Sequence, residues 1–286
     1  MITNFETNKV LIAKGLIYDD VTGCLLGFIH RHKIEWGALP NTSSPLHIWA
    51  RDYMPVQVSK EKFVRFCYTP DYLQDSPEYK PDTSAILSEL GIHAIDSDII
   101  IDGGNIISCG DKVIMTDKII RENPHYKQNK LIDTLSQLLE AEIILIPEDR
   151  YDEYGHADGM VRYMGNNCLL LNNYCDFDKT LRKKLLAALS PHFDITELHY
   201  GAYTEKSWAY INFLHVGHHL FVPKPEDKLA GTAFKQISDA YPQCMCHQIW
   251  GCDNVVREGG ALNCCTWNVL SDLPEKENNN ELQNTK

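Results

Sequence analysis

The sequence lacks three features that mark whole classes of protein: a long apolar run, a basic stripe and a secretion signal. No apolar stretch in the 286 residues approaches the roughly 20 residues of a membrane helix, so we expect no membrane partner. Lys and Arg do not cluster and the formal net charge is −12, so we expect no nucleic-acid partner. Residues 1–12 contain no basic segment followed by an apolar run, which favours a cytoplasmic protein.

The ten cysteines also lack the spacing of a standard zinc site. The nearest candidate is Cys244, Cys246, His247 and Cys252, whose intervals match no common zinc pattern. Without a secretion signal, cysteines are more often free thiols than a disulfide framework. We therefore predict no metal site, with a structural metalloprotein as an alternative that bound zinc would support.

Five polar residues recur at nearly constant intervals along the chain. Asp52, Asp102, Asp158, Asn212 and Cys264 are separated by 50, 56, 54 and 52 residues. Such a period indicates a repeat architecture. Each residue heads or lies in a predicted β-hairpin, and the hairpins span 54–68, 102–116, 160–171, 208–223 and the segment that begins at 264.

Helices and single strands alternate with these hairpins. Apolar residues at helical spacing predict helices at 21–32, 83–90, 130–140, 179–189 and 227–241. Short strands follow at 92–95, 143–147, 195–198 and 243–250. A first strand at 9–13 is expected to pair with the last one at 267–270, which would close a ring and remove exposed sheet edges. We predict one domain over residues 1–270 and a disordered tail, rich in Asn and Glu, over 271–286.

Equivalent positions of a cyclic repeat point toward one axis, so the five polar residues are expected to converge. Three carboxylates, an amide and a thiol cannot form an apolar core, and none of the five is cationic. A bound cation would supply the missing charge. A guanidinium suits better than a metal ion, because its planar fork binds carboxylates bidentately.

Three further residues accompany these positions. His156 lies two residues before Asp158, so on a strand both side chains would face the same cleft. Trp49, three residues before Asp52, has the flat face that stacks on a cation, although a core role is the usual one for Trp. Cys264 and Cys265 follow Gly259-Gly260, a turn that would place a nucleophilic thiol at a strand end.

The motifs Trp49-Ala-Arg-Asp52, Asp102-Gly-Gly-Asn105, Gly155-His-Ala-Asp158, Tyr210-Ile-Asn212 and Gly259-Gly-Ala-Leu-Asn-Cys264 occur in this order. Together they resemble the agmatine deiminase and bacterial-type (Porphyromonas-type) peptidylarginine deiminase family of guanidine-modifying proteins. The resemblance covers nearly the whole chain. It implies an α/β pentein fold, a five-bladed α/β propeller built as a pseudo-fivefold ring of ββαβ units.

The resemblance also implies a role for each site residue. Cys264 takes the position of the nucleophile, His156 that of the acid/base, and Asp52 and Asp158 those of guanidinium clamps. The substrate-binding positions are those of Trp49, Asp102 and Asn212. The implied reaction is hydrolysis of a small cationic guanidine through a covalent thiouronium on cysteine, with no cofactor. The first expected substrate is agmatine, which would give N-carbamoylputrescine and ammonia in putrescine biosynthesis, and a homodimer is compatible with the resemblance.

The sequence departs from the family pattern at two positions of the site. Asn263 precedes the nucleophile where agmatine deiminases commonly have His, and Asp102 stands where they tend to have Glu. These departures leave peptidyl arginine and free arginine open as substrates. No Arg matches a carboxylate-binding position, and Arg121 and Arg162 are expected to be surface or structural residues. The alternative of another class is a pentein that binds a partner without catalysis.

Overall fold

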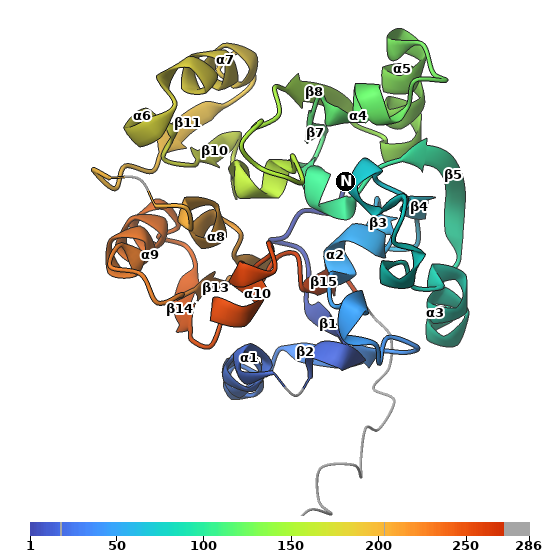
Figure 1. The fold of residues 1–286 in the computed structure, drawn as a ribbon, viewed down its shortest axis with the longest axis horizontal. Coiled ribbons are helices and arrows are strands. Elements are labelled where there is room, and N and C mark those ends of the chain that lie inside the picture. The colour runs from blue at the N-terminus through green and yellow to red at the C-terminus, as the bar shows by residue number, and fades with distance from the viewer. Residues whose placement is uncertain (18, 203, 272–286) are drawn as a thin grey trace, which may run out of the picture.

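The computed structural model describes residues 1–17, 19–202 and 204–271, which form a mixed α/β fold built from small sheets. The tail predicted over 271–286 lies outside the described residues except for Ser271. In four of the described sheets the two strands of a hairpin pair antiparallel, and a third strand that follows a helix adds in parallel. Figure 1 shows these units placed one after another around a common centre. Within the described chain, no helix is long and apolar enough to cross a membrane.

Four units of strands and helices follow the N-terminal one. The first consists of β3 (Val56–Gln57), β4 (Phe63–Cys67), α3 (Thr83–Leu90) and β5 (Ala94–Ile100). The second consists of β6 (Ile107–Ser108), β7 (Lys112–Thr116), α4 (Lys118–Glu122), α5 (Gln128–Leu139) and β8 (Glu142–Ile146). The third unit consists of β9 (Val161–Gly165), β10 (Cys168–Leu171), α6 (Tyr174–Phe177), α7 (Lys179–Leu189) and β11 (Asp194–Glu197). The fourth consists of β12 (Leu214–Val216), β13 (His219–Pro223), α9 (Ala230–Ala240) and β14 (Met245–Ile249).

The two ends of the chain share the remaining sheet. β1 (Lys9–Ala13) pairs antiparallel with β15 (Thr266–Val269) and parallel with β2 (Glu35–Leu39), which follows α1 (Asp20–Arg31). Their register sets Leu11 opposite Trp267. The predicted pairing of the first and last strands is therefore confirmed, and it fixes Cys264 next to the N-terminal strand.

The helices form where capping and apolar spacing agree. The Asp82 carboxylate accepts the N–H of Ala85 at the start of α3, and Gly91 ends that helix in the left-handed region with φ 67°. The Asp178 carboxylate caps α7 in the same way, and Leu185 is among the residues that this helix buries. Each helix buries one apolar face and leaves its polar face to solvent, and α7 packs against β8 of the preceding sheet as well as against β10 of its own.

Short helical turns lie between the repeats, and here two predictions were wrong. Asp52 does not head a strand, because it lies in α2 (Ala50–Tyr53). The segment 208–211 is not part of a hairpin strand either, because α8 (Ser207–Ile211) precedes β12. Similar turns are the 3₁₀ helices η5 (Gly103–Asn105) and η6 (Ala157–Gly159), and α10 (Asp253–Arg257) is a further short helix. Aromatic and β-branched residues favour strands only where a neighbouring strand can pair, and these segments have none.

Candidate active site

The five repeated positions lie together at the centre of the molecule, and each sits on or beside a turn that precedes a strand. Asp52 belongs to α2, Asp102 immediately precedes η5, and Asp158 lies within η6. Asn212 ends α8, and Cys264 lies in the turn before β15. A single helical turn has few residues to shield a side chain, so these positions direct polar groups toward the shared centre.

Gly104 is the meeting point of the Asp52, His156 and Asp158 side chains. Its N–H donates to Asp52 Oδ1 at 2.9 Å. A Cβ at Gly104 would lie 2.7 Å from His156 Nδ1, 2.8 Å from Asp52 Oδ1 and 3.3 Å from Asp158 Oδ2. The three side chains therefore approach one another across a position that only glycine leaves open.

His156 is held by carboxylates on both ring nitrogens. His156 Nε2 is 2.6 Å from Asp102 Oδ2, and Nδ1 is 3.8 Å from Asp52 Oδ1. Burial alone would lower the pKa of His156, but Asp52 and the hydrogen bond to Asp102 outweigh it and raise the pKa to about 9. The imidazole is therefore protonated at neutral pH.

Asp102 binds protein groups on one oxygen and leaves the other without a partner. Besides His156, Lys118 Nζ donates to Asp102 Oδ2 at 2.9 Å and the Tyr72 hydroxyl donates at 3.2 Å. Burial would raise the pKa of Asp102, but the bonds from His156 and Lys118 outweigh burial and lower it. Asp102 Oδ1 is buried and has no hydrogen-bond partner in the described structure. Asp102 thus fixes the orientation and the charge of His156.

The thiol of Cys264 faces Asp158 and Asn212. Cys264 Sγ lies 3.3 Å from Asn212 Oδ1 and 3.6 Å from Asp158 Oδ2. The Cys264 backbone N–H also donates to Asn212 Oδ1 at 3.3 Å, and Asn263 Nδ2 donates to Asp158 Oδ2 at 2.6 Å. Asn263, one of the two departures from the family pattern, therefore anchors the Asp158 carboxylate.

The site is closed from solvent, and burial shifts the pKa values of its ionisable groups. Cys264 is 8 % exposed and Asp158 is 2 % exposed. Burial raises the pKa of the Cys264 thiol well above its ordinary value, and the charges of Asp158 and Asp52 raise it further. Burial and the neighbouring carboxylates raise the pKa of Asp52 to about 7, against the opposing effect of His156. A cation placed between the carboxylates would relieve both shifts.

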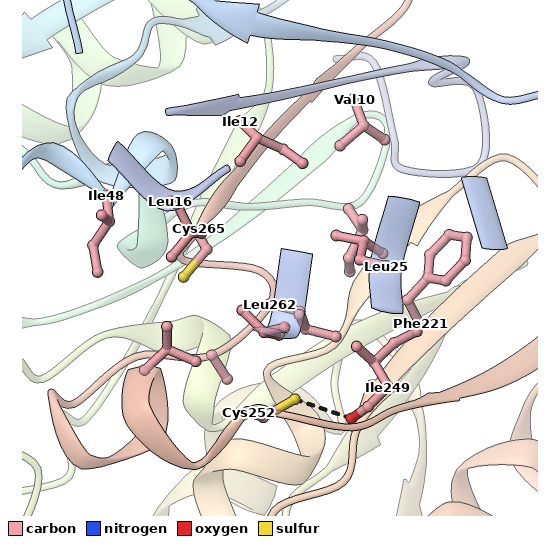
Figure 2. Packing of buried hydrophobic residues seen from close by; sticks show 14 of the residues in the cluster. Val10, Ile12, Leu16, Leu25, Ile48, Phe221, Ile249, Cys252, Leu262 and Cys265 are labelled. Carbon is pink, nitrogen blue, oxygen red and sulfur yellow. Dashed lines mark hydrogen bonds between the residues drawn. The ribbon is translucent and has the colours of Figure 1, made fainter. Parts of the chain in front are cut away.

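Cys264 and Cys265 differ in their surroundings. Cys265 is 1 % exposed and belongs to an apolar cluster with Ile12, Leu16 and Ile48. Figure 2 shows Cys265 among these side chains. Only the first thiol of the pair has polar partners among the five repeated positions.

Trp49 contacts the glycine turn of the loop that carries Cys264. A Cβ at Gly260 would lie 2.0 Å from the Trp49 ring, and Trp49 packs against the apolar cluster that contains Cys265. The predicted stacking of Trp49 on a cation remains a prediction, whereas its packing on the loop is observed.

Tyr72 and Tyr154 cover the site, and the sequence analysis did not find them. Their rings meet edge to face at 5.1 Å, and Tyr154 lies 6.1 Å from the His156 ring. The Tyr154 hydroxyl donates to the Glu258 carbonyl at 3.4 Å. Tyr72 lies between β4 and α3, and Tyr154 lies between β8 and β9, so both come from irregular connections that carry no periodic signal.

Arg51 is a further residue of the site that was not predicted from the sequence. Its backbone N–H donates to the Cys264 carbonyl at 3.0 Å, and its Nε donates to the Asn263 carbonyl at 3.4 Å. Its guanidinium also hydrogen-bonds Asn268. Arg51 thereby ties the turn of Asp52 to the turn of Cys264, a role that the Trp-Ala-Arg-Asp motif gave no reason to expect.

Three other sequence-based expectations concern residues near the site. His156 is not on a strand, because it precedes η6, yet it still approaches Asp158 across Gly104. Arg121 forms ion pairs with Asp71 and Glu148. Arg162 is buried and donates to the Phe213 carbonyl at 3.0 Å. Both arginines have protein partners, as the sequence analysis expected.

The cysteine set weighed as a zinc site does not form a ligand cluster in the described residues. Cys252 is buried and its thiol donates to the Ile249 carbonyl at 3.0 Å. His247 instead groups with His32 and His219. Adjacent residues on a strand point to opposite faces, so Cys246 and His247 diverge.

A family model described as Porphyromonas-type peptidyl-arginine deiminase matches residues 1–269. No curated protein matches the chain. Among solved structures, an agmatine deiminase from C. jejuni with substrate bound is 17 % identical, with a TM-score of 0.71 over 96 % of each chain. An agmatine deiminase of Enterococcus faecalis is 15 % identical, with a TM-score of 0.72 over 94 % of each chain. The N-terminal domain of an arginine dihydrolase from Cyanobacteria is 13 % identical, with a TM-score of 0.63, over 92 % of this chain and 97 % of that domain. At these identities the likeness concerns the fold.

Proposed function

Because the chain belongs to the Porphyromonas-type peptidyl-arginine deiminase family, we propose that it is a hydrolase that deiminates a small guanidinium substrate through a covalent adduct on Cys264. The observation that carries the proposal is the group of side chains around Gly104: two carboxylates and an imidazole approach this glycine, and one of the carboxylates also contacts the Cys264 thiol. That group has the residue types that hold a guanidinium and attack its carbon.

In this proposal Asp52 and Asp158 bind the two sides of the guanidinium. The bound cation offsets the negative charge that raises the pKa of the Cys264 thiol, so the thiol loses its proton when substrate arrives. Deprotonation in the bound complex makes the nucleophile available only where a guanidinium is present. Asn212, at 3.3 Å from Sγ, aligns the sulfur.

The reaction then proceeds in two halves on the same carbon. Cys264 Sγ forms the C–S bond and gives a tetrahedral adduct. His156 then gives its proton to a terminal nitrogen of this adduct, the C–N bond breaks, and ammonia leaves behind an S-alkylthiouronium. A water molecule next adds to this carbon with neutral His156 as the base. One water proton returns to His156 and the other to the sulfur as the C–S bond breaks, which gives the ureido product. The proton that the Cys264 thiol releases at the start is accounted for by ammonia, which takes up one proton in solution to become ammonium.

We propose agmatine as the substrate and N-carbamoylputrescine as the product, which is a step in putrescine biosynthesis. A carboxylate on the substrate would need a cationic partner near the site. Arg121 is paired with Asp71 and Glu148, and Arg162 is buried against Phe213. Their engagement favours a guanidine without a carboxylate, and free arginine and peptidyl arginine are the alternatives.

The proposal extends to the organisation of the protein. The five sheets would form the pseudo-fivefold pentein ring of ββαβ units as one domain over residues 1–270. The reaction would need no cofactor, and the protein would act in the cytoplasm on a small molecule. These features agree with the residue types of the site, in which each chemical step has a side chain to perform it.

The test is ammonia release from the purified protein with agmatine, free arginine and a blocked peptidyl arginine in parallel. We expect turnover of agmatine, its loss in Cys264→Ala and its retention in Cys265→Ala, the matched variant one residue away. Turnover of the peptide alone would move the function to protein deimination. Absence of turnover with all three substrates in folded protein would contradict deimination and favour a non-catalytic scaffold.

A further inference from the structure

Three histidines from separate elements meet on the side of the molecule away from the catalytic turns. His32 follows the end of α1, His219 begins β13, and His247 lies in β14. Each offers a ring nitrogen, and these nitrogens all lie within 4.8 Å of one another. Figure 1 shows α1, β13 and β14 side by side at the edge of the ring.

The strand register explains why two of these side chains converge. β13 and β14 are parallel, and Phe221 is the partner of His247. His219 lies two residues before Phe221, so all three side chains project from the same face of the sheet. Their rings stack, with His219 and His247 at 5.5 Å and Phe221 and His247 at 5.2 Å between centroids.

The helix brings the third histidine onto that face. Phe28 of α1 lies 5.0 Å from the His247 ring, which sets the end of the helix over the strands. The His32 ring then lies 4.8 Å from His219 and 4.5 Å from His247. The three rings are half-buried, so their positions are restricted by packing while one side stays open to solvent.

The spacing of the nitrogens matches a tetrahedral metal centre. Two ligands at a Zn–N distance of about 2.1 Å stand about 3.4 Å apart in a tetrahedron. His219 Nδ1 and His247 Nε2 are 3.2 Å apart. The His32 nitrogen needs a shift of about 1.4 Å at most, which rotation of a half-buried side chain provides.

The protonation state of the cluster also suits a metal. Burial lowers the pKa of His219, with His32 and His218 adding to the effect. Burial, His32, His219 and Arg31 lower the pKa of His247 to about 4. Metal ions bind neutral imidazole, so these two ligands need not lose a proton first. Arg31 opposes a bound cation, which the three nitrogen ligands must outweigh.

We propose that His32, His219 and His247 form a binding site for Zn²⁺ or a similar divalent transition metal, with water in the fourth position. The metal would link α1, which connects two strands of the sheet that closes the ring, to the sheet that contains β13 and β14. This site is separate from the deimination site and does not depend on its chemistry.

The experiment measures Zn²⁺ binding to the full chain by equilibrium dialysis, and thermal unfolding with and without Zn²⁺. We expect one bound equivalent, an affinity lower by about tenfold or more in His219→Asn and His247→Asn, and a Zn²⁺-induced rise in Tm that these variants lack. His30→Asn is the matched control, because His30 is exposed, lies on α1 two residues from His32, and contacts Trp36 instead of the cluster. His32→Asn, at the end of the helix, serves if a strand variant does not fold.

Co²⁺ in place of Zn²⁺ distinguishes this site from the free thiols of the chain. We expect the visible spectrum of a tetrahedral nitrogen site without a thiolate charge-transfer band. Failure to bind, equal binding in His219→Asn and His247→Asn, or a thiolate band would each overturn the proposal.

Discussion

The thiol of Cys264 and the imidazole of His156 are not poised as an ion pair before substrate binds. Burial and two carboxylates raise the pKa of Cys264, whereas the pKa of His156 is about 9. At neutral pH the resting site therefore holds a neutral thiol and an imidazolium. In the proposed mechanism the substrate cation is therefore required to form the Cys264 thiolate.

We predict that alkylation of Cys264 by iodoacetamide is slow at pH 7 and accelerates by about tenfold per pH unit as pH rises, because only the thiolate reacts. Below a raised pKa the thiolate fraction increases with pH, so the rate should not level off near neutrality. Peptide mass spectrometry with Cys264→Ser as control identifies the labelled residue. Fast labelling that is independent of pH down to pH 6 would mean that the resting thiol is ionised.

Asp102 is predicted to set the acid/base range of His156. Replacement by Asn keeps the shape but removes the carboxylate that hydrogen-bonds Nε2 and helps to raise the pKa. The imidazolium would then deprotonate at lower pH, so the alkaline limb of the kcat profile should move down. Asp111→Asn, at an exposed carboxylate, should leave the profile unchanged. An unaltered alkaline limb in Asp102→Asn would exclude this role.

At the scale of elements, the turns before the hairpins place the site. Gly104 and Gly103 let η5 pass close to other backbone and side chains, and a Cβ at Gly103 would lie 1.9 Å from the Arg51 carbonyl oxygen. The two glycines of the Asp-Gly-Gly-Asn motif are thus required for the close packing of η5 against α2. This packing keeps the Asp52, His156 and Asp158 side chains close together although η5 is not a strand.

Gly104→Ala should reduce kcat by about a hundredfold while the chain stays folded, because the new methyl group would displace His156 and Asp52 by about 1 Å. Gly27→Ala is the control, since a Cβ there meets nothing within 4 Å and the residue lies within α1. Circular dichroism and ammonia release measure the two effects. Full activity in Gly104→Ala would show that the geometry around this glycine is not critical.

The regular elements were predictable from the sequence, whereas the short turns were not. The helices predicted at 83–90 and 179–189 have the bounds of α3 and α7, because apolar residues at helical spacing indicate them. α8 was not found, because the aromatic residues of 208–211 favour strands and one helical turn gives no periodic signal. The repeat spacing located the five site positions, but Tyr72 and Lys118 come from irregular or short elements that only tertiary structure brings to the site.

At the scale of the whole molecule, the chain closes on itself through β1 and β15. Ile12 of β1 is fully buried in the cluster that contains residues of α1, β13, β14 and the loop that carries Cys264. Figure 2 shows Ile12 with Leu25, Phe221 and Cys265 around it. The N-terminal strand therefore supports the sequence neighbour of the proposed nucleophile from the far end of the chain.

Ile12→Ala should lower the free energy of unfolding by about 2–5 kcal/mol, because it leaves a cavity in this cluster. Ile95→Ala, at a residue that is 47 % exposed, should change it by about 0.5 kcal/mol or less. Urea denaturation followed by Trp fluorescence compares the two variants. Equal effects would mean that the closing strand adds no more stability than an exposed position.

The most direct test of the account is intact-protein mass spectrometry of the enzyme acid-quenched during turnover of agmatine. We predict a species heavier by the mass of agmatine minus ammonia, with fragmentation placing the adduct on Cys264 and not on Cys265. Turnover of agmatine with no such species under fast quenching, or an adduct on Cys265, would contradict covalent deimination at Cys264.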